Sequence, residues 1–304
     1  MTPARWLLAL LVLGAPAAFA QQVPASGNAP SYTNRALSDV PNAGAIRARI
    51  WAPRLDDGWV PQGVAFGDGA LWVSAYQSTD PNIDSGPCRV FKVNVADGGM
   101  AGQFDLPATC THAGGLAHTG DRYLYVADAG YLFRVDTQAA LAAGRCVDLG
   151  CSTLPLRGSL RGSFLAYAKR TLWLGESVPT GQTARLWQIP EARVLAIIAG
   201  SGDTLDEHSS VAVTPLAARS QGVAITRDGA LWITQSDAKS GLLQKVEPGT
   251  GKVLQEYAMA AGVGDIDFAP DGTLWALSEA GSMRRNAWPT FFPLLFSLDP
   301  AALH

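Results

Sequence analysis

Residues 62–73 read QGVAFGDGALWV and residues 221–233 read QGVAITRDGALWI, so one short segment occurs twice almost unchanged. Residues 265–276, DIDFAPDGTLWA, form a third copy, and looser copies begin near residues 114 and 163. Each copy has an apolar run, a turn and a second apolar run, and Asp-Gly at such a turn is a strong hairpin signal. Further alternating runs follow, so each unit is predicted to contribute four antiparallel strands. Repeated four-stranded units are typical of β-propeller blades, and we predict an all-β propeller.

The spacing of the copies sets the number of blades. They begin near residues 62, 114, 163, 221 and 264, which predicts five blades, or six if the interval from 163 to 221 contains a degenerate one. The last copy lacks a fourth run, whereas the alternating segment Ile46–Trp51 precedes the first copy. We expect Ile46–Trp51 to pair with Leu294–Leu298, because this pairing closes the ring and removes an exposed strand edge.

The N-terminal residues have the pattern of an export signal. Residues 1–20 combine Arg5, a short apolar centre and the small-residue site Ala18-Phe19-Ala20, as in a secretory signal peptide. Residues 21–43 are rich in Pro, Ser, Asn and Ala and are predicted to form a disordered leader, with one propeller domain over residues 44–304. No apolar stretch is long enough to span a bilayer. These features predict a periplasmic or secreted protein.

Charge and cysteine content narrow the classes further. The formal net charge is −3 and no Lys/Arg cluster stands out, which argues against nucleic acid as a partner. Four cysteines form an even set in an oxidising compartment, and the strand order favours the pairs Cys88–Cys110 and Cys146–Cys151. The alternative is a metal site, but partners at ligand spacing are missing.

Polar residues gather where the inner strands are predicted to begin and the second strands to end. These positions share one face of a propeller, together with long loops, and such convergence is the usual form of a ligand site. We expect a small molecule or a glycan to bind there. The candidate ligand-binding residues are Gln62, Asp128, Gln221, Gln235, Glu279, Arg284, Arg285 and Trp288.

Three residues of this face are candidates for catalysis. His112 precedes the small residues Ala113-Gly114-Gly115 and is the predicted general base, with Glu176 and Asp265 as its catalytic partners. Asp265, Asp128 and Glu176 are the candidate ligands of one divalent cation, Ca²⁺, Mg²⁺ or Zn²⁺. Each of these side chains also has a structural interpretation, because any propeller exposes a polar rim to water.

The aromatic residues fall into two groups. Trp72, Trp173, Trp232 and Trp275 recur at one strand position, and a repeated position indicates repeated packing between blades. Trp288 instead lies in a loop that is not repeated. Its ring could stack on a ligand or fix the loop to the ring of blades, and the sequence leaves both open.

The copies at Pro61–Val73 and Ser220–Ile233 resemble the blade signature of the SMP-30/gluconolactonase, NHL-repeat and streptogramin-lyase-like propellers. The first group implies metal-assisted lactone hydrolysis, with Gln62 and Gln221 standing where its members have Asn and Asp ligands. The third group implies elimination with a metal and a His base, for which His112 and His208 are candidates. The expected function is therefore ligand binding with hydrolase or lyase activity on a lactone- or ester-like substrate. The alternative is a non-catalytic protein-binding scaffold that exposes the aromatic loop Trp288–Phe292.

Overall fold

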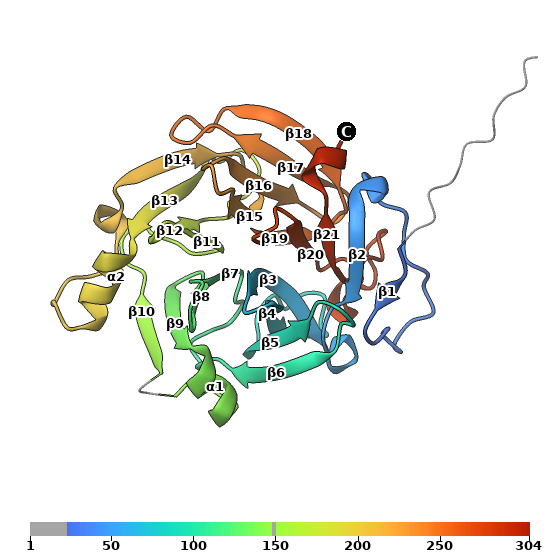
Figure 1. Ribbon diagram of the computed structural model, residues 1–304, viewed down its shortest axis with the longest axis horizontal. Coiled ribbons are helices and arrows are strands. Elements are labelled where there is room, and N and C mark those ends of the chain that lie inside the picture. Colours follow the sequence, from blue (N-terminus) through green and yellow to red (C-terminus); the bar gives the residue numbers. More distant parts are fainter. Residues whose placement is uncertain (1–22, 148–149) are drawn as a thin grey trace, which may run out of the picture.

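The fold is a ring of five sheets (Figure 1). The computed structural model describes residues 23–147 and 150–304, so the predicted signal peptide lies outside the described residues. Four sheets have four antiparallel strands in sequence order, and the fifth combines segments from both ends of the chain. The strands that line the centre are β3 (Trp59–Gly67), β7 (Gly115–His118), β11 (Phe164–Ala168), β15 (Ser220–Ile225) and β19 (Val263–Phe268).

The remaining strands follow outward in each blade. Blade 1 adds β4 (Ala70–Gln77), β5 (Cys88–Asn94) and β6 (Met100–Asp105). Blade 2 adds β8 (Tyr123–Asp128), β9 (Tyr131–Asp136) and β10 (Cys151–Pro155). Blade 3 adds β12 (Thr171–Gly175), β13 (Ala184–Pro190) and β14 (Ala212–Leu216). Blade 4 adds β16 (Leu231–Ser236), β17 (Gly241–Val246) and β18 (Val253–Met259), and blade 5 adds β20 (Leu274–Ser278), β21 (Leu294–Leu298), β2 (Ile46–Trp51) and β1 (Ala25–Ser26).

The ring closes as the sequence predicts. β2 pairs antiparallel with β21, with Ile50 opposite Leu295, so an N-terminal strand completes the last blade. Figure 1 shows the blue β2 beside the red β21. The pairing covers the edge of β21 with a strand from the other end of the chain, which is how this ring is closed.

The long interval in blade 3 does not contain a sixth blade. After β13 the chain forms helix α2 (Glu191–Ile198) and then β14, the outer strand of the same sheet. The acidic segment between them, which includes the 3-10 helix η3 (Glu207–Ser209), lies against the loop before β11, where the Glu207 carboxylate accepts a hydrogen bond from the Ser159 N–H at 2.8 Å. Helix α1 (Thr137–Ala143) lies between β9 and β10 of blade 2, and the side chain of Asp136 caps its N-terminus. The other 3-10 helices are η1 (Ala43–Ala45), η2 (Leu55–Asp57), η4 (Met283–Arg285) and η5 (Pro300–Ala302).

The recurring aromatics pack between blades, as predicted. At three of the repeated positions the aromatic contacts a residue at the end of the inner strand of the next blade: Trp72 stacks on His118 at 6.2 Å and Tyr125 stacks on Tyr167 at 6.2 Å. Trp232 meets the ring of Phe268 edge-on at 6.2 Å. The repeat therefore encodes the seam between neighbouring blades, the contact on which a ring of sheets depends.

The Gln-Gly pairs of the repeat have a steric cause. A Cβ at Gly63 would lie 2.4 Å from the Ser74 hydroxyl oxygen, and one at Gly222 would lie 2.6 Å from the Cα of Asp265. The inner strands approach one another so closely at this level that a side chain does not fit. Glycine is therefore needed where each strand enters the crowded centre.

The N-terminal leader differs from the prediction. Within its described part, residues 23–43, Ala25–Ser26 form a strand beside β2, and Arg35 donates to the carbonyl oxygens of Asn286 and Pro289. The Tyr32 hydroxyl donates to the Gly281 carbonyl. A composition poor in large apolar residues suggested disorder, but backbone carbonyls of the last loop supply the partners that such a segment lacks on its own. The leader holds that loop against blade 5.

Both predicted disulfides are present. Cys88–Cys110 has a Cα–Cα distance of 5.8 Å and Cys146–Cys151 one of 5.4 Å. Within the described residues no helix is long and apolar enough to cross a membrane.

Candidate functional site

We call the face at which the inner strands begin and the second strands end the mouth of the ring. Irregularities in the inner strands shape this face. The register of β3 shifts between Pro61 and Gly63, and that of β15 shifts between Ser220 and Gly222. A bulge inserts one unpaired residue and turns its side chain away from the regular alternation. The residues inserted here are Gln62 and Gln221, both partly exposed.

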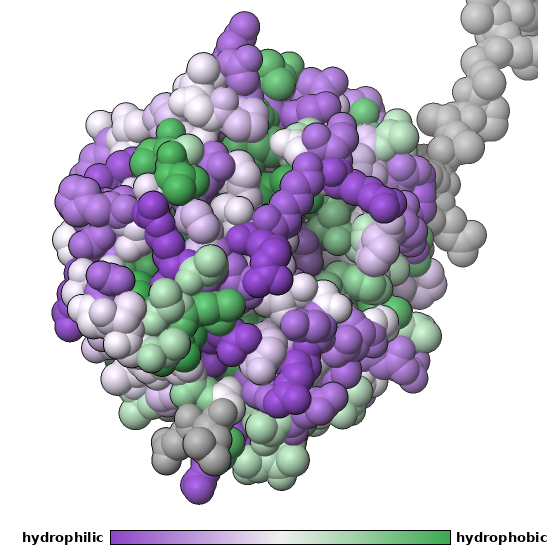
Figure 2. Space-filling view, turned by 60° about the vertical axis from the view of Figure 1, so that its left-hand side comes forward, coloured by the Kyte–Doolittle hydropathy of each residue, from purple (hydrophilic) through white to green (hydrophobic). Residues whose placement is uncertain are grey.

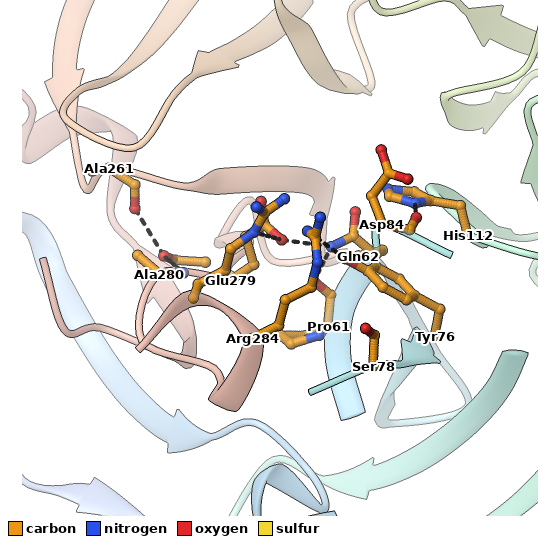
Figure 3. A network of polar contacts seen from close by, with 12 residues as sticks. Pro61, Gln62, Tyr76, Ser78, Asp84, His112, Ala261, Glu279, Ala280 and Arg284 are labelled. Atoms are coloured by element: carbon orange, nitrogen blue, oxygen red, sulfur yellow. Dashed lines mark hydrogen bonds and ion pairs between the residues drawn. The ribbon is translucent and has the colours of Figure 1, made fainter. Parts of the chain in front are cut away.

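Gln62 joins blade 1 to blade 5. Its amide nitrogen donates to the Glu279 carboxylate at 3.1 Å and to the Pro61 carbonyl at 2.9 Å. The same carboxylate oxygen accepts from Arg285 Nε at 3.3 Å. The side chains of Glu279 and Arg285 are 18% and 19% exposed, so this ion pair is screened less than a surface pair. Figure 3 shows Gln62 and Glu279 turned toward each other.

Arg284 joins the last loop to blade 1. Its Nη1 donates to the Tyr76 hydroxyl at 2.8 Å, and its Nε donates to the Asp80 carbonyl at 3.2 Å. Tyr76 is fully buried at the end of β4. Burial raises the pKa of Tyr76, and the charge of Glu279 raises it further, so the phenol stays neutral.

His112 lies on the same phenol ring. Its imidazole stacks on Tyr76 with ring centroids 4.6 Å apart, and Nδ1 lies 2.6 Å from the Asp84 carbonyl oxygen (Figure 3). A carbonyl only accepts, so the neutral ring carries its proton on Nδ1 and presents the lone pair of Nε2. No hydrogen bond to Nε2 exists within the described residues, and this is the form that a general base requires.

Two contacts hold the loop that carries His112: hydrogen bonds from its backbone to the Asp128 carboxylate, and the disulfide Cys88–Cys110. The Asp128 carboxylate accepts hydrogen bonds from the backbone N–H groups of Thr111, His112 and Ala113 at 2.8–3.1 Å. Cys110, two residues before His112, is bonded to Cys88, which follows the loop that carries Asp84. Asp128 is therefore a positioning residue, and the disulfide fixes both partners of the His112–Asp84 contact.

These side chains come from three blades and form what we term the mouth cluster. Trp288 borders it: Arg285 lies 4.5 Å above its ring, and the ring packs so closely on Gly262 that a Cβ there would lie 3.2 Å away. Of the two roles considered for Trp288, this contact is fixation of the loop to the ring of blades. The mouth cluster consists of Gln62, Tyr76, His112, Glu279, Arg284 and Arg285.

The predicted residues of blades 3 and 4 bond within their own blades. Glu176 is paired with Arg185 at 2.6 Å, and the amide of Gln235 donates to Gln244 at 2.8 Å. Gln221 has no side-chain hydrogen bond among the residues that the structure describes and is the one predicted group of blade 4 left open.

Asp265 lies in the centre of the ring rather than at its mouth. Asp265 and Asp267 of β19 stand where the other inner strands mostly have Gly and Ala, and that space holds their carboxyl groups. Asp265 accepts from the Leu116 N–H at 3.0 Å, and Asp267 accepts from the Phe66 N–H at 2.8 Å. Burial raises the pKa of Asp265 well above its usual range and that of Asp267 to about 7. The two carboxyl groups tie blade 5 to blades 1 and 2.

The predicted metal ligands do not fit a shared cation. Asp265 is fully buried, Asp128 is engaged by backbone N–H groups and Glu176 by Arg185. Over residues 23–147 and 150–304 there is no group of three or more His, Cys, Asp or Glu side chains arranged to hold a metal.

Sequence reasoning missed Tyr76, although the repeat contains a signal for it. Tyr76 and Glu279 each lie four residues after the recurring aromatic, whereas Asp128, Glu176 and Gln235 lie three residues after it. Successive strand residues point to opposite faces, so the two sets diverge. The first set reaches across blades into the mouth cluster, and the second set bonds locally. The offset from the recurring aromatic, four residues in one set and three in the other, therefore distinguishes the two sets of polar side chains.

Comparison with known proteins identifies the fold and no family. No protein-family model matches the sequence, and no curated protein matches it. Among solved structures, the glutaminyl cyclase of Myxococcus xanthus is 14% identical, with a TM-score of 0.50 over 84% of this chain and 96% of that one. The PQQ-bound aldose sugar dehydrogenase of Streptomyces coelicolor is 13% identical, with a TM-score of 0.46 over 79% and 94% of the two chains. Virginiamycin B lyase of Staphylococcus aureus is 14% identical, with a TM-score of 0.37 over 72% and 63%.

Proposed function

We propose that this protein is exported and binds a small molecule or a glycan at the mouth cluster. The observation that carries the proposal is the convergence of polar groups from three blades, several of whose atoms have no partner within the described residues. These atoms are Gln62 Oε1, Glu279 Oε1, His112 Nε2 and both terminal nitrogens of Arg285. Held on β3, on the loop after β20 that includes η4, and on a disulfide-anchored loop, they form a preorganised set of donors and acceptors.

The arrangement supports hydrolysis or elimination at a lactone- or ester-like carbonyl. His112 Nε2 is the base that removes a proton, either from water or from the carbon beside the carbonyl. The Arg285 guanidinium supplies N–H donors for the negative charge that develops on the carbonyl oxygen. Glu279 orients Arg285 and Gln62 through one shared oxygen, so it is a positioning residue for both.

Thermal denaturation with a panel of lactones, sugar acids, oligosaccharides and glutaminyl peptides tests the proposal. The last class is included because a glutaminyl cyclase has the same fold. We expect one class to raise Tm in a concentration-dependent manner, since a ligand that binds only the folded state stabilises it. The shift should disappear in Arg285→Ala and persist in Arg185→Ala. Equal shifts in both variants would contradict binding at the mouth cluster.

The alternative function, a protein-binding scaffold, was expected to expose the aromatic loop. Phe291 and Phe292 are 1% and 0% exposed, and Trp288 is the one aromatic of this loop that stays partly exposed, so the loop offers a single ring rather than an aromatic patch. On the face turned forward in Figure 2, hydrophilic and hydrophobic residues are intermixed. A stable protein interface needs a contiguous, well-packed area, so these observations favour the small-ligand proposal.

A further inference from the structure

A groove lies where blades 4 and 5 meet, on the face opposite the mouth cluster. It is bounded by the turn between β15 and β16, the turn between β19 and β20, and η5 near the C-terminus. Its volume is about 740 Å³, and its walls are mainly apolar. This volume lies within the range of about 300–1,000 Å³ that is typical of small-molecule sites. The apolar walls are formed by Ile225, Trp232, Phe268, Pro270 and Pro300.

The seam between blades 1 and 2 is the corresponding place in the repeat, and there the space is filled. His118 stacks on Trp72 with an interplanar angle of 19°, and its ring packs so tightly on Gly67 that a Cβ there would lie 2.2 Å from it. Asp68 lies 3.5 Å from His118 Nε2, and the Lys92 ammonium lies 4.8 Å from the Trp72 ring. Protein side chains thus cover the recurring tryptophan completely.

The seam between blades 4 and 5 is arranged differently. Phe268 meets Trp232 only with its edge, at an interplanar angle of 71°, and Tyr257 stacks on Trp232 at 6.1 Å. Phe268 and Ile225 stay partly exposed in the groove. An apolar floor that water covers is a favourable place for an apolar ligand body, because its burial removes that surface from water.

One unpaired cation borders this apolar surface. Arg227 is exposed in the turn of blade 4 and forms no ion pair within the part of the chain that the structure describes. Asp299 is the one carboxylate among the lining residues, and it is paired with Arg47 at 2.9 Å. The groove therefore combines apolar walls with one guanidinium that has no ion-pair partner among the described residues.

We propose that this groove binds a small amphipathic anion. An aromatic or aliphatic body would lie on Phe268 and Ile225, beside the 6% of Trp232 that stays exposed, and a carboxylate or sulfonate would accept hydrogen bonds from Arg227. Arginine favours such oxyanions because its planar fork offers two parallel donors. The site is independent of the mouth cluster, which lies at the other end of the strands.

Two fluorescent probes with the same rings separate charge from apolar contact. We expect 1-anilinonaphthalene-8-sulfonate to bind at one site per chain and to bind about tenfold more weakly to Arg227→Gln, as for the loss of one charged hydrogen bond. Neutral N-phenyl-1-naphthylamine should bind both proteins alike. Ala301→Trp, which fills the groove from the exposed η5, should abolish the binding of both probes. Lys239→Gln, an exposed cation of blade 4 outside the groove, is the matched control and should change neither.

Two results would overturn the proposal. The first is that Ala301→Trp leaves binding of the sulfonate probe unchanged, which would move the site elsewhere. The second is a concentration-dependent dimer in light scattering that Ala301→Trp dissociates, because a second copy would then be the occupant of the groove. Circular dichroism of Arg227→Gln, Ala301→Trp and Lys239→Gln tests whether each variant folds.

Discussion

The rim of the ring has two unlike halves. On the side of blades 5, 1 and 2, the side chains bond between blades: Gln62 to Glu279, Tyr76 to Arg284, and His112 onto Tyr76. On the side of blades 3 and 4, Glu176 and Gln235 bond within one blade, and Gln221 makes no side-chain hydrogen bond to the described residues. Cross-blade contacts leave unpaired atoms facing the mouth, whereas local pairs satisfy themselves. A polar rim alone is therefore not a site, and the direction of its hydrogen bonds distinguishes the two halves.

The disulfides provide the largest contrast. Cys88–Cys110 closes 22 residues beneath the mouth cluster, and Cys146–Cys151 closes 5 residues in blade 2. Chain entropy predicts losses of about 3 and about 2 kcal/mol for their removal. Cys88→Ser with Cys110→Ser should also weaken ligand binding, because Asp84 and His112 lose their common anchor. Urea denaturation and calorimetric titration measure both effects. If removal of Cys146–Cys151 weakened ligand binding as much as removal of Cys88–Cys110 does, the Cys88–Cys110 disulfide would have no special role at the mouth cluster, contrary to this account.

His112 is the next test. His112→Gln removes the lone pair at Nε2, and we expect turnover of the hydrolysed or eliminated substrate to fall about 100-fold, as for the loss of a general base. His208→Gln, on the outer segment of blade 3, should leave turnover within twofold. The comparison uses initial rates at saturating substrate. An unchanged turnover rate in His112→Gln would contradict the role of His112 as the base and leave ligand binding as the only function of the mouth cluster.

Glu279 and Glu176 form a matched pair of carboxylates. Glu279→Gln loses the charge that orients Arg285, and we expect the affinity for the stabilising compound of the thermal panel to fall about 30-fold, equivalent to about 2 kcal/mol. Glu176→Gln should change the affinity less than twofold, because its partner Arg185 serves only blade 3. Isothermal titration of both variants checks this. A larger loss in Glu176→Gln would reverse the assignment of the halves.

The carboxyl groups below the mouth give the smallest change in free energy per pH unit, seen as a dependence of stability on pH. The pKa of Asp267 is raised by burial to about 7, above its unfolded value near 4. The folded state then binds more protons than the unfolded state between about pH 4 and 7, so the free energy of unfolding falls as pH rises through this window, by at most about 1.4 kcal/mol per pH unit for one proton. Asp267→Asn should reduce the slope, and Asp265, whose pKa burial also raises, should keep the remainder. An unchanged slope would show that Asp267 titrates normally.

The sequence predicted the architecture well because a repeat states the same constraint several times. The blade number, the pairing of Ile46–Trp51 with Leu294–Leu298 and both disulfides follow from periodicity and strand order. Periodicity also predicted that the recurring tryptophans pack between blades, and the contact of Trp72 with His118 confirms it.

The site was harder to predict because it depends on direction rather than position. Asp128, Glu176 and Glu279 all end second strands, yet one residue of offset turns the first two away from the mouth cluster. The prediction of a disordered leader differs from the structure because the partners of the leader are backbone carbonyls of a distant loop, and Arg35 and Asn286 are 251 residues apart in the sequence. Contacts between segments that lie so far apart in the sequence cannot be predicted from the composition of a segment or from its local pattern of apolar residues.

Hydrogen–deuterium exchange with and without the compound that stabilises the protein most tests the division of the rim directly. The account predicts slower exchange in residues 76–86, 110–113 and 279–288 and no change in residues 176–185 and 235–240. Protection confined to the segments of blades 3 and 4 would contradict it.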